Sequence, residues 1–115
     1  MTVTHIVSFQ FKQGTKPDSV AELISRMLAL KETCLHPSTG KPYLTTCAGG
    51  RDNSVQGLQN GLTHVFVVTF DTVEERDYYA LEDPVHLEFV NWSDTVVQQV
   101  QAIDFVDGEF GSHGI

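Results

Sequence analysis

Three histidines occupy positions from which a side chain could move protons. His5 and His64 each stand near the start of a segment in which apolar residues alternate, and His86 stands among apolar residues at helical spacing. The two alternating segments place their histidine on the face with the bulkier residues, so we expect all three to point into one space between a sheet and its helices. Imidazole titrates near neutral pH and is the commonest general acid or base. A single buried histidine is more often structural, so only their convergence favours catalysis.

Two tyrosines precede His86 on a short predicted helix. If Val73 and Leu81 mark the buried side of this helix, Tyr78 lies nearer to that side and Tyr79 points further toward solvent. A phenol beside an imidazole can donate a hydrogen bond to a developing oxyanion. The alternative is an amphipathic tyrosine that lies along the surface.

The sequence carries no recognisable metal site. Cys34, His36 and Cys47 lack an established zinc spacing and a fourth ligand, and the pattern of the three histidines shows no obvious carboxylate partner. Gly49-Gly50 is not followed by the Gly-Lys-Ser/Thr of a phosphate-binding loop. We therefore expect a protein without a metal or a cofactor.

The elements that must position these side chains follow the order β-α-β-β-α(α)-β. Alternation and turn residues predict strands at 2–11, 43–48, 62–70 and 100–106. Helical spacing predicts helices at 15–36, 72–81 and 84–98. Capping-box spacings begin at Thr15 and Thr72, and Asp83-Pro84 offers a cap followed by a proline in the first turn.

This order is that of the α+β, ferredoxin-like fold, in which helices cover one face of a single sheet. The other face carries Ile6, Val65 and Val67 and is too apolar to leave in water. We therefore expect a symmetric homodimer in which two sheets pack against each other as a dimeric α/β barrel. Residues 1–107 form the domain, and the glycine-bearing residues 108–115 are expected to be a flexible tail.

Length and charge exclude several classes of function. The chain has 115 residues, enough for one domain, and a formal net charge of −8. An acidic surface repels nucleic acid and anionic membranes, so neither is expected as a partner. No apolar run is long enough to span a bilayer, no secretory signal is evident, and two cysteines make no disulfide framework. The expected location is cytoplasmic.

Three segments resemble the stress-responsive dimeric α/β-barrel family. They are His5-Ile6-Val7, the strand that contains Thr63-His64, and the stretch from Asp77-Tyr78-Tyr79 to Pro84-Val85-His86. The resemblance covers nearly the whole chain and implies ferredoxin-like protomers that pair through their sheets. Many members are associated with stress and have no assigned chemistry. One member is a cyclase that closes a ring in a linear polyketide by intramolecular aldol condensation, without a cofactor.

The resemblance to the cyclase implies roles for four residues of this chain. His86 and Tyr78 would be the catalytic pair, with His5 and His64 in the substrate pocket. Two departures stand out. The stretch between the helix aspartate and the proline before His86 is two residues longer here, and Met27 stands where the cyclase has a pocket tyrosine. The second departure indicates a different substrate.

The expected function is that of a cofactor-independent cyclase or isomerase that acts on a polyketide-like or aromatic small molecule through His86 and Tyr78. The residues expected to bind the substrate are His5, His64, Val7, Phe9, Met27, Phe66 and Phe89. Two alternatives stay open: a non-catalytic, stress-responsive or ligand-binding barrel, and a heme- or metal-dependent oxygenase on the same fold.

Overall fold

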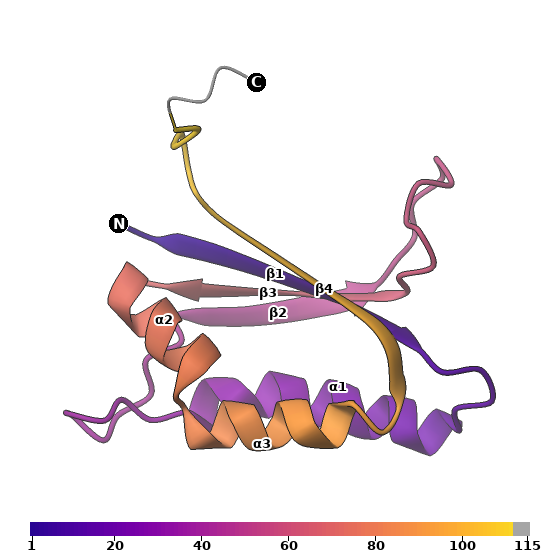
Figure 1. The fold of residues 1–115 in the computed structure, drawn as a ribbon, viewed down its shortest axis with the longest axis horizontal. Coiled ribbons are helices and arrows are strands. Elements are labelled where there is room, and N and C mark those ends of the chain that lie inside the picture. The colour runs from indigo at the N-terminus through magenta and orange to yellow at the C-terminus, as the bar shows by residue number, and fades with distance from the viewer. Residues whose placement is uncertain (112–115) are drawn as a thin grey trace.

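The computed structural model describes residues 1–111, which form one antiparallel sheet with three helices on one side (Figure 1). The strands are β1 (Val3–Phe11), β2 (Thr46–Arg51), β3 (His64–Phe70) and β4 (Val97–Val106). The helices are α1 (Pro17–Thr33), α2 (Val73–Leu81) and α3 (Pro84–Ser93). The sheet order β2-β3-β1-β4 is that of the ferredoxin-like fold, which confirms the predicted class.

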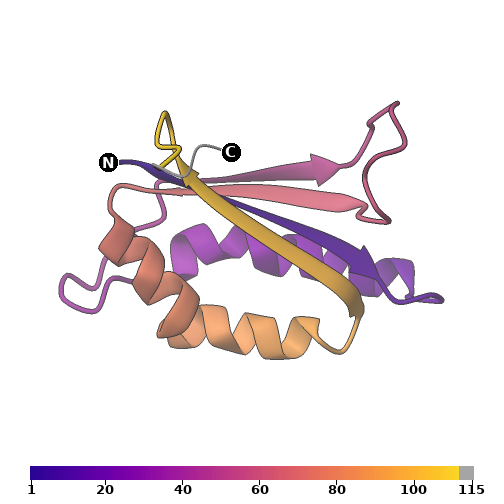
Figure 2. The ribbon, with the colours of Figure 1, turned by 45° about the horizontal axis from the view of Figure 1, so that its top comes forward.

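The helices lie on one face of the sheet, with α1 and α3 side by side (Figure 2). The alternation of β1 and β3 decides which residues meet them. Val7 and Phe9 of β1 are buried against the helices, as are Phe66 and Phe70 of β3. The predicted assignment of the bulkier face to the helix side is therefore confirmed.

Two of the three predicted helix caps are present. The Thr72 hydroxyl accepts a hydrogen bond from the Glu75 amide at 3.1 Å, and the Asp83 carboxylate accepts from the Val85 amide at 2.9 Å. The first helix differs, because its N-cap is Lys16, which makes no side-chain cap. The Thr15 hydroxyl instead donates to the carbonyl of Lys12 at 2.6 Å, so the predicted capping box at Thr15 is wrong.

The second strand begins three residues later than predicted and continues through both glycines. Gly49 pairs with Phe66, and a Cβ atom at Gly49 would lie 2.3 Å from Cδ2 of that ring. The missing side chain therefore allows the ring to lie directly on β2. The sequence interpretation took the glycines as a strand end, whereas here they permit a close approach between neighbouring strands.

The last helix is shorter than predicted and ends at Ser93, so that β4 starts at Val97. Val97, which lies within the predicted helix 84–98, is the first residue of this strand, and Val100, the predicted strand start, is its fourth. Both still lie beside the helix, because they line a cavity that it forms with the sheet. Residues 112–115 of the expected tail lie outside the described residues. Within residues 1–111, no helix is long and apolar enough to cross a membrane.

Candidate functional site

A cavity of about 70 Å³ lies between α3 and the half of the sheet formed by β1 and β4. Two histidines and one tyrosine face it among apolar side chains. The lining residues from β1 and α1 are His5, Val7, Phe9 and Met27, and those from α2, α3 and β4 include Tyr79, His86, Phe89, Val90, Ser93 and Val100. An apolar cavity with a few convergent polar groups is the usual form of a small-molecule site.

His86 faces this cavity from the first turn of α3. Its Nδ1 lies 2.7 Å from the carbonyl oxygen of Tyr79. A carbonyl oxygen can only accept, so Nδ1 carries the proton and Nε2 of the neutral ring keeps a lone pair. Burial lowers the pKa of His86, and the nearby His5 lowers it further. His86 is therefore neutral at physiological pH, the form a general base requires.

Tyr79 lies against the His86 ring and is itself buried. The two ring centroids are 3.8 Å apart with the planes tilted by 23°, which is a stacked arrangement. The Tyr79 hydroxyl has no hydrogen-bond partner among the described residues. Burial raises the pKa of Tyr79, so the phenol stays protonated near neutral pH and keeps an O–H that can donate a hydrogen bond. A polar atom of a molecule in the cavity would satisfy it.

The expected orientation of the two tyrosines is wrong. Tyr79 is 1% exposed and lines the cavity, whereas Tyr78 is half-buried and packs on Tyr43, with ring centroids 5.8 Å apart. The reason is that Val73 and Leu81, which were used to orient the helix, are both exposed and do not mark its buried side. Tyr78 does not line the cavity.

His5 reaches the same cavity from β1 and is held by a carboxylate. Its Nδ1 lies 2.6 Å from Oδ1 of Asp104, which stands opposite His5 in the register of β1 and β4. The other oxygen, Oδ2, accepts a hydrogen bond from Nη1 of Arg76 at 2.9 Å. This chain of contacts fixes the imidazole and leaves its Nε2 free to exchange a proton. The sequence pattern suggested no carboxylate partner, because the register between β1 and β4 was unknown.

His64 does not join the other two histidines, so the expected convergence of three is wrong. It pairs with Phe9 in the sheet, whereas His5 pairs with Val68, four residues further along β3. Its ring packs edge-on against Phe11 at 5.2 Å and lines a separate cavity between α1 and β2. Phe66 also lines that second cavity. Five of the predicted binding residues line the first cavity: His5, Val7, Phe9, Met27 and Phe89.

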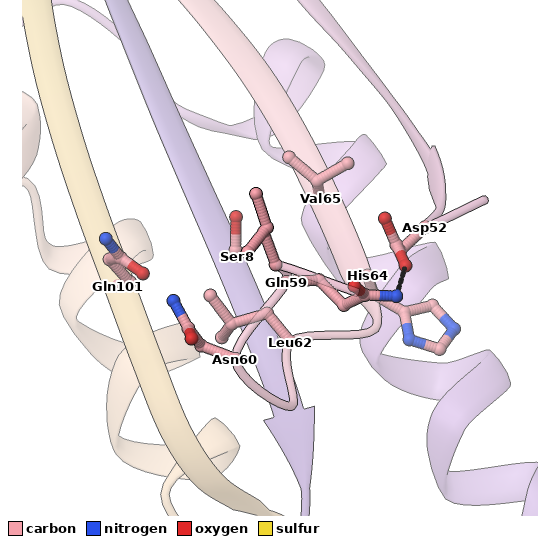
Figure 3. Close-up of a pocket in the computed structure, with 9 residues that line it drawn as sticks. Ser8, Asp52, Gln59, Asn60, Leu62, His64, Val65 and Gln101 are labelled. Carbon is pink, nitrogen blue, oxygen red and sulfur yellow. Dashed lines mark hydrogen bonds between the residues drawn. The ribbon is translucent and has the colours of Figure 1, made fainter. Parts of the chain in front are cut away.

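A third, more open hollow of about 320 Å³ lies on the opposite face of the sheet, beside the loop 52–62. Figure 3 shows Ser8, Val65 and Gln101 around it, and the His64 ring directed away from them. The Gln59 amide donates to Oδ2 of Asp52 at 2.7 Å and closes the loop at its rim. No titratable pair comparable to His5 and His86 faces this hollow, so the first cavity is the better candidate for chemistry.

Among residues 1–111, no group of three or more histidine, cysteine, aspartate or glutamate side chains could hold a metal ion. Cys34 and Cys47 are both free thiols. Burial, together with Asp83, raises the pKa of Cys34 to about 12, so this thiol is protonated and a poor ligand or nucleophile. The titratable residues that line the first cavity are His5, His86, Tyr79 and Asp94.

The neutral histidines make a prediction about stability. The pKa values of His86 and His64 are lowered in the folded protein, mainly by burial. The unfolded chain therefore binds more protons than the folded one below about pH 6.5, and the free energy of unfolding must fall there as pH decreases. We expect chemical denaturation to show this loss on acidification. The double variant His86→Gln, His64→Asn should show a shallower slope, and an unchanged slope would contradict the assignment.

The fold and the site define a ferredoxin-like α+β protein with an apolar cavity that contains paired imidazoles under its helices. A sequence model of the stress responsive A/B barrel domain matches residues 3–107. The chain belongs to this family, which confirms the resemblance.

Individual relatives share both sequence and fold with the chain. The stress-response A/B barrel domain-containing protein HS1 of Arabidopsis thaliana is 29% identical over 103 residues, which cover 90% of this chain and 87% of that protein. A crystal structure of an Arabidopsis thaliana protein has a TM-score of 0.76 and 28% identity, with 95% and 98% of the two chains covered. The hydroxynitrile lyase of Passiflora edulis has a TM-score of 0.77 at 20% identity, with 96% of each chain covered, and so shares the fold.

Proposed function

We propose that the protein is a cofactor-independent enzyme that moves protons on a small carbonyl compound. The observation that carries this proposal is the geometry of His86, whose Nδ1–H is bonded to the Tyr79 carbonyl while its ring lines the cavity. A neutral imidazole fixed in one tautomer next to a largely apolar cavity is suited to general-base catalysis. The cyclase or isomerase activity expected from the sequence is part of this proposal, because both reactions begin with the same proton transfer.

In the proposed reaction, Nε2 of His86 removes a proton from the carbon next to a substrate carbonyl. The C–H electron pair moves into the C–C bond, and the carbonyl oxygen becomes an enolate oxygen. The Tyr79 hydroxyl, which has no other partner among the described residues, donates a hydrogen bond to that oxygen. If the substrate is a β,γ-unsaturated ketone, the dienolate takes a proton at its γ-carbon, which is isomerisation. Otherwise the α-carbon attacks a second carbonyl, whose oxygen takes up the proton, which is aldol ring closure.

His5 is the second proton carrier of this proposal. Asp104 holds Nδ1 of His5 and orients the ring, so that its Nε2 can exchange a proton with the substrate. Arg76 orients the carboxylate rather than touching the cavity, so it is a positioning residue. The proposal thus assigns the base role to His86 and the return of the proton to His5.

The size of the cavity limits the substrate. Its volume of about 70 Å³ is well below the roughly 300–1,000 Å³ typical of pockets for drug-sized ligands. A small ketone or aldehyde fits this space better than a long polyketide. Two neighbours on the same fold are described as a hydroxynitrile lyase and a cofactor-independent oxygenase, from Passiflora edulis and Streptomyces nogalater, which supports small-molecule chemistry on this fold.

The test is exchange of the α-protons of butan-2-one in deuterated water, followed by NMR with and without protein. Exchange above the buffer rate, and saturation with ketone concentration, is the expected result. Cleavage of acetone cyanohydrin should be measured in parallel, because it requires proton removal from a hydroxyl rather than from carbon. If neither compound reacts and neither binds, the non-catalytic alternative replaces the proposal.

The two tyrosines give a matched comparison. Tyr79→Phe removes the unpaired hydroxyl of a residue that lines the cavity, and we expect the exchange rate to fall about tenfold, since water can partly replace a hydrogen-bond donor. Tyr78→Phe removes a hydroxyl outside the cavity and should leave the rate unchanged. The reverse result would restore the role that the sequence resemblance implies for Tyr78.

We also propose that two copies pair through the uncovered face of the sheet. In the strand register, Ala48, Val67, Ile6 and Ile103 form one apolar row across all four strands. On the edge strand, Ile103 is 55% exposed and its neighbour Phe105 is 46% exposed. A solved relative from Thermobifida fusca, 21% identical and with a TM-score of 0.68 over 92% of this chain and 91% of that chain, is described as dimeric. A second copy is the partner that would cover this row.

The proposed location of the protein is the cytoplasm. Neither cysteine is in a disulfide, and Cys34 is fully buried. Free thiols of this kind persist in a reducing compartment. Fractionation of the source cells would test this directly.

A further inference from the structure

The second cavity, between α1 and β2, has features that the proposed reaction does not use. It has a volume of about 120 Å³ and is lined by Ile24, Leu28, Gly49, Arg51, His64 and Phe66. Most of this lining is apolar, and its polar groups are one guanidinium and one imidazole. Phe9 lines the first cavity and Phe66 the second, with ring centroids 6.0 Å apart. These two rings stand between the cavities, so the second is a site of its own.

Arg51 differs from the other two arginines of the chain, because it forms no ion pair within the described residues. Arg26 pairs with Glu22 and lies over the Trp92 ring, and Arg76 pairs with two aspartates. Arg51 forms no such ion pair in residues 1–111. The carboxylate of the adjacent Asp52 accepts hydrogen bonds from other groups. Its Oδ2 accepts from the Gln59 amide (Figure 3), and its Oδ1 accepts from the Ser54 backbone amide. An unpaired guanidinium on a protein of net charge −8 is available to an anionic ligand.

His64 can add a second donor to this cavity. Its Nδ1 lies 2.8 Å from the Thr63 hydroxyl. The Thr63 hydroxyl has one proton, and its other acceptor, the Phe9 carbonyl, is more distant at 3.4 Å. When that hydroxyl donates to Nδ1, the proton of the neutral ring lies on Nε2, which can then donate to an anion. A carboxylate beside Arg51 would favour this tautomer. The imidazole is buried, so the donor lies where water competes little.

From these contacts we propose that the α1–β2 cavity binds a small carboxylate with an apolar body. The carboxylate would lie between Arg51 and His64, and the body would lie against Ile24, Leu28 and Phe66. Arginine suits this role because its planar fork matches the two oxygens of a carboxylate. Gly49 contributes by having no side chain, since a Cβ atom there would displace the Phe66 ring. The inference does not depend on the proposed reaction, because it concerns a different cavity.

The experiment is an NMR titration of the ¹⁵N-labelled protein with pentanoate and, separately, with its neutral analogue pentanamide. We expect pentanoate to shift the backbone amides of Gly49, Gly50 and Phe66, and to bind about tenfold more tightly than pentanamide because of the charge-assisted bonds. Equal affinities would overturn the proposal. Shifts centred on His86 and Ser93 would also overturn it, because they would place the ligand in the first cavity.

Three variants complete the test. Arg51 is exposed, so Arg51→Gln should fold normally. It should weaken pentanoate about tenfold and leave pentanamide unchanged. The matched control is Lys41→Gln, which removes an exposed cation outside this cavity and should change neither affinity. Leu28→Trp, at a partly exposed helix position, should fill the cavity and weaken both ligands. Undiminished pentanoate binding in Arg51→Gln or in Leu28→Trp would overturn the proposal.

Discussion

His86→Gln is expected to lower the rate of α-proton exchange at least about 10²-fold, equivalent to about 2.7 kcal/mol of activation free energy. The glutamine amide has no basic lone pair in place of Nε2, so the proton acceptor is lost. The same amide can still donate to the Tyr79 carbonyl, which His86 Nδ1 contacts at 2.7 Å. A leucine at this position would leave that carbonyl without its imidazole donor. Glutamine therefore separates the catalytic role from the structural one.

The control for this variant is His36→Gln, the same substitution on the turn after α1, where the His36 imidazole accepts from the Ser38 amide at 3.0 Å. It should retain the exchange rate of the parent. The melting temperature of His86→Gln should stay within a few degrees of the parent. A fully active His86→Gln protein would remove the acid–base mechanism. A protein that melts much lower would show that the imidazole is structural.

The fold was predictable because its strongest signals are local. Alternation in β1 and β3 assigned each residue to a face, and the caps at Thr72 and Asp83 marked two helix starts. The order of elements then left few topologies. The second strand was misplaced because a glycine pair usually ends a strand, whereas Gly49 is required here by its contact with Phe66 in a neighbouring strand. A contact between strands that lie apart in the sequence cannot be predicted from the residues around Gly49 alone.

The candidate site was only partly predictable, since it depends on register. Period-two alternation shows that His5 and His64 share a face, but not how far apart along the sheet they lie. Antiparallel pairing places His5 opposite Val68 on β3 and opposite Asp104 on β4. This register separates His5 from His64 and brings the Asp104 carboxylate to the His5 ring. Asp104 and Arg76 were missed for this reason. Family resemblance identified His5 and His86, which do share a cavity.

The choice between the tyrosines failed for a different reason. A helix of nine residues has few positions from which its buried side can be inferred. Its two aliphatic ends, Val73 and Leu81, are exposed because they lie at the margins of the helix layer. The buried position is Tyr79, whose ring packs on Phe70 and His86. The packing of Tyr79 against rings of other elements therefore decides which side of α2 is buried, and the apolar residues at the two ends of the helix do not.

Val67→Asp is expected to convert the proposed dimer into monomers or to unfold it. Val67 pairs with Ile6 on one side and Ala48 on the other, so it lies in the middle of the apolar row on the outer face of the sheet. An interface of obligate type buries on the order of 2,000 Å² in total. A carboxylate in the centre of that contact would be desolvated without a partner, which costs several kcal/mol. Light scattering of the parent and the variant at micromolar concentration measures the outcome.

The matched control is Val73→Asp, which adds the same charge on the helix side of the molecule, at the partly exposed first residue of α2. A carboxylate at a helix N-terminus is favourable, so this variant should fold and remain dimeric. Circular dichroism of Val67→Asp distinguishes dissociation from unfolding. A parent protein that is a stable monomer at micromolar concentration would contradict the pairing, because the row from Ala48 to Ile103 would then be left in water. A second copy that covers all four strands would bury that row.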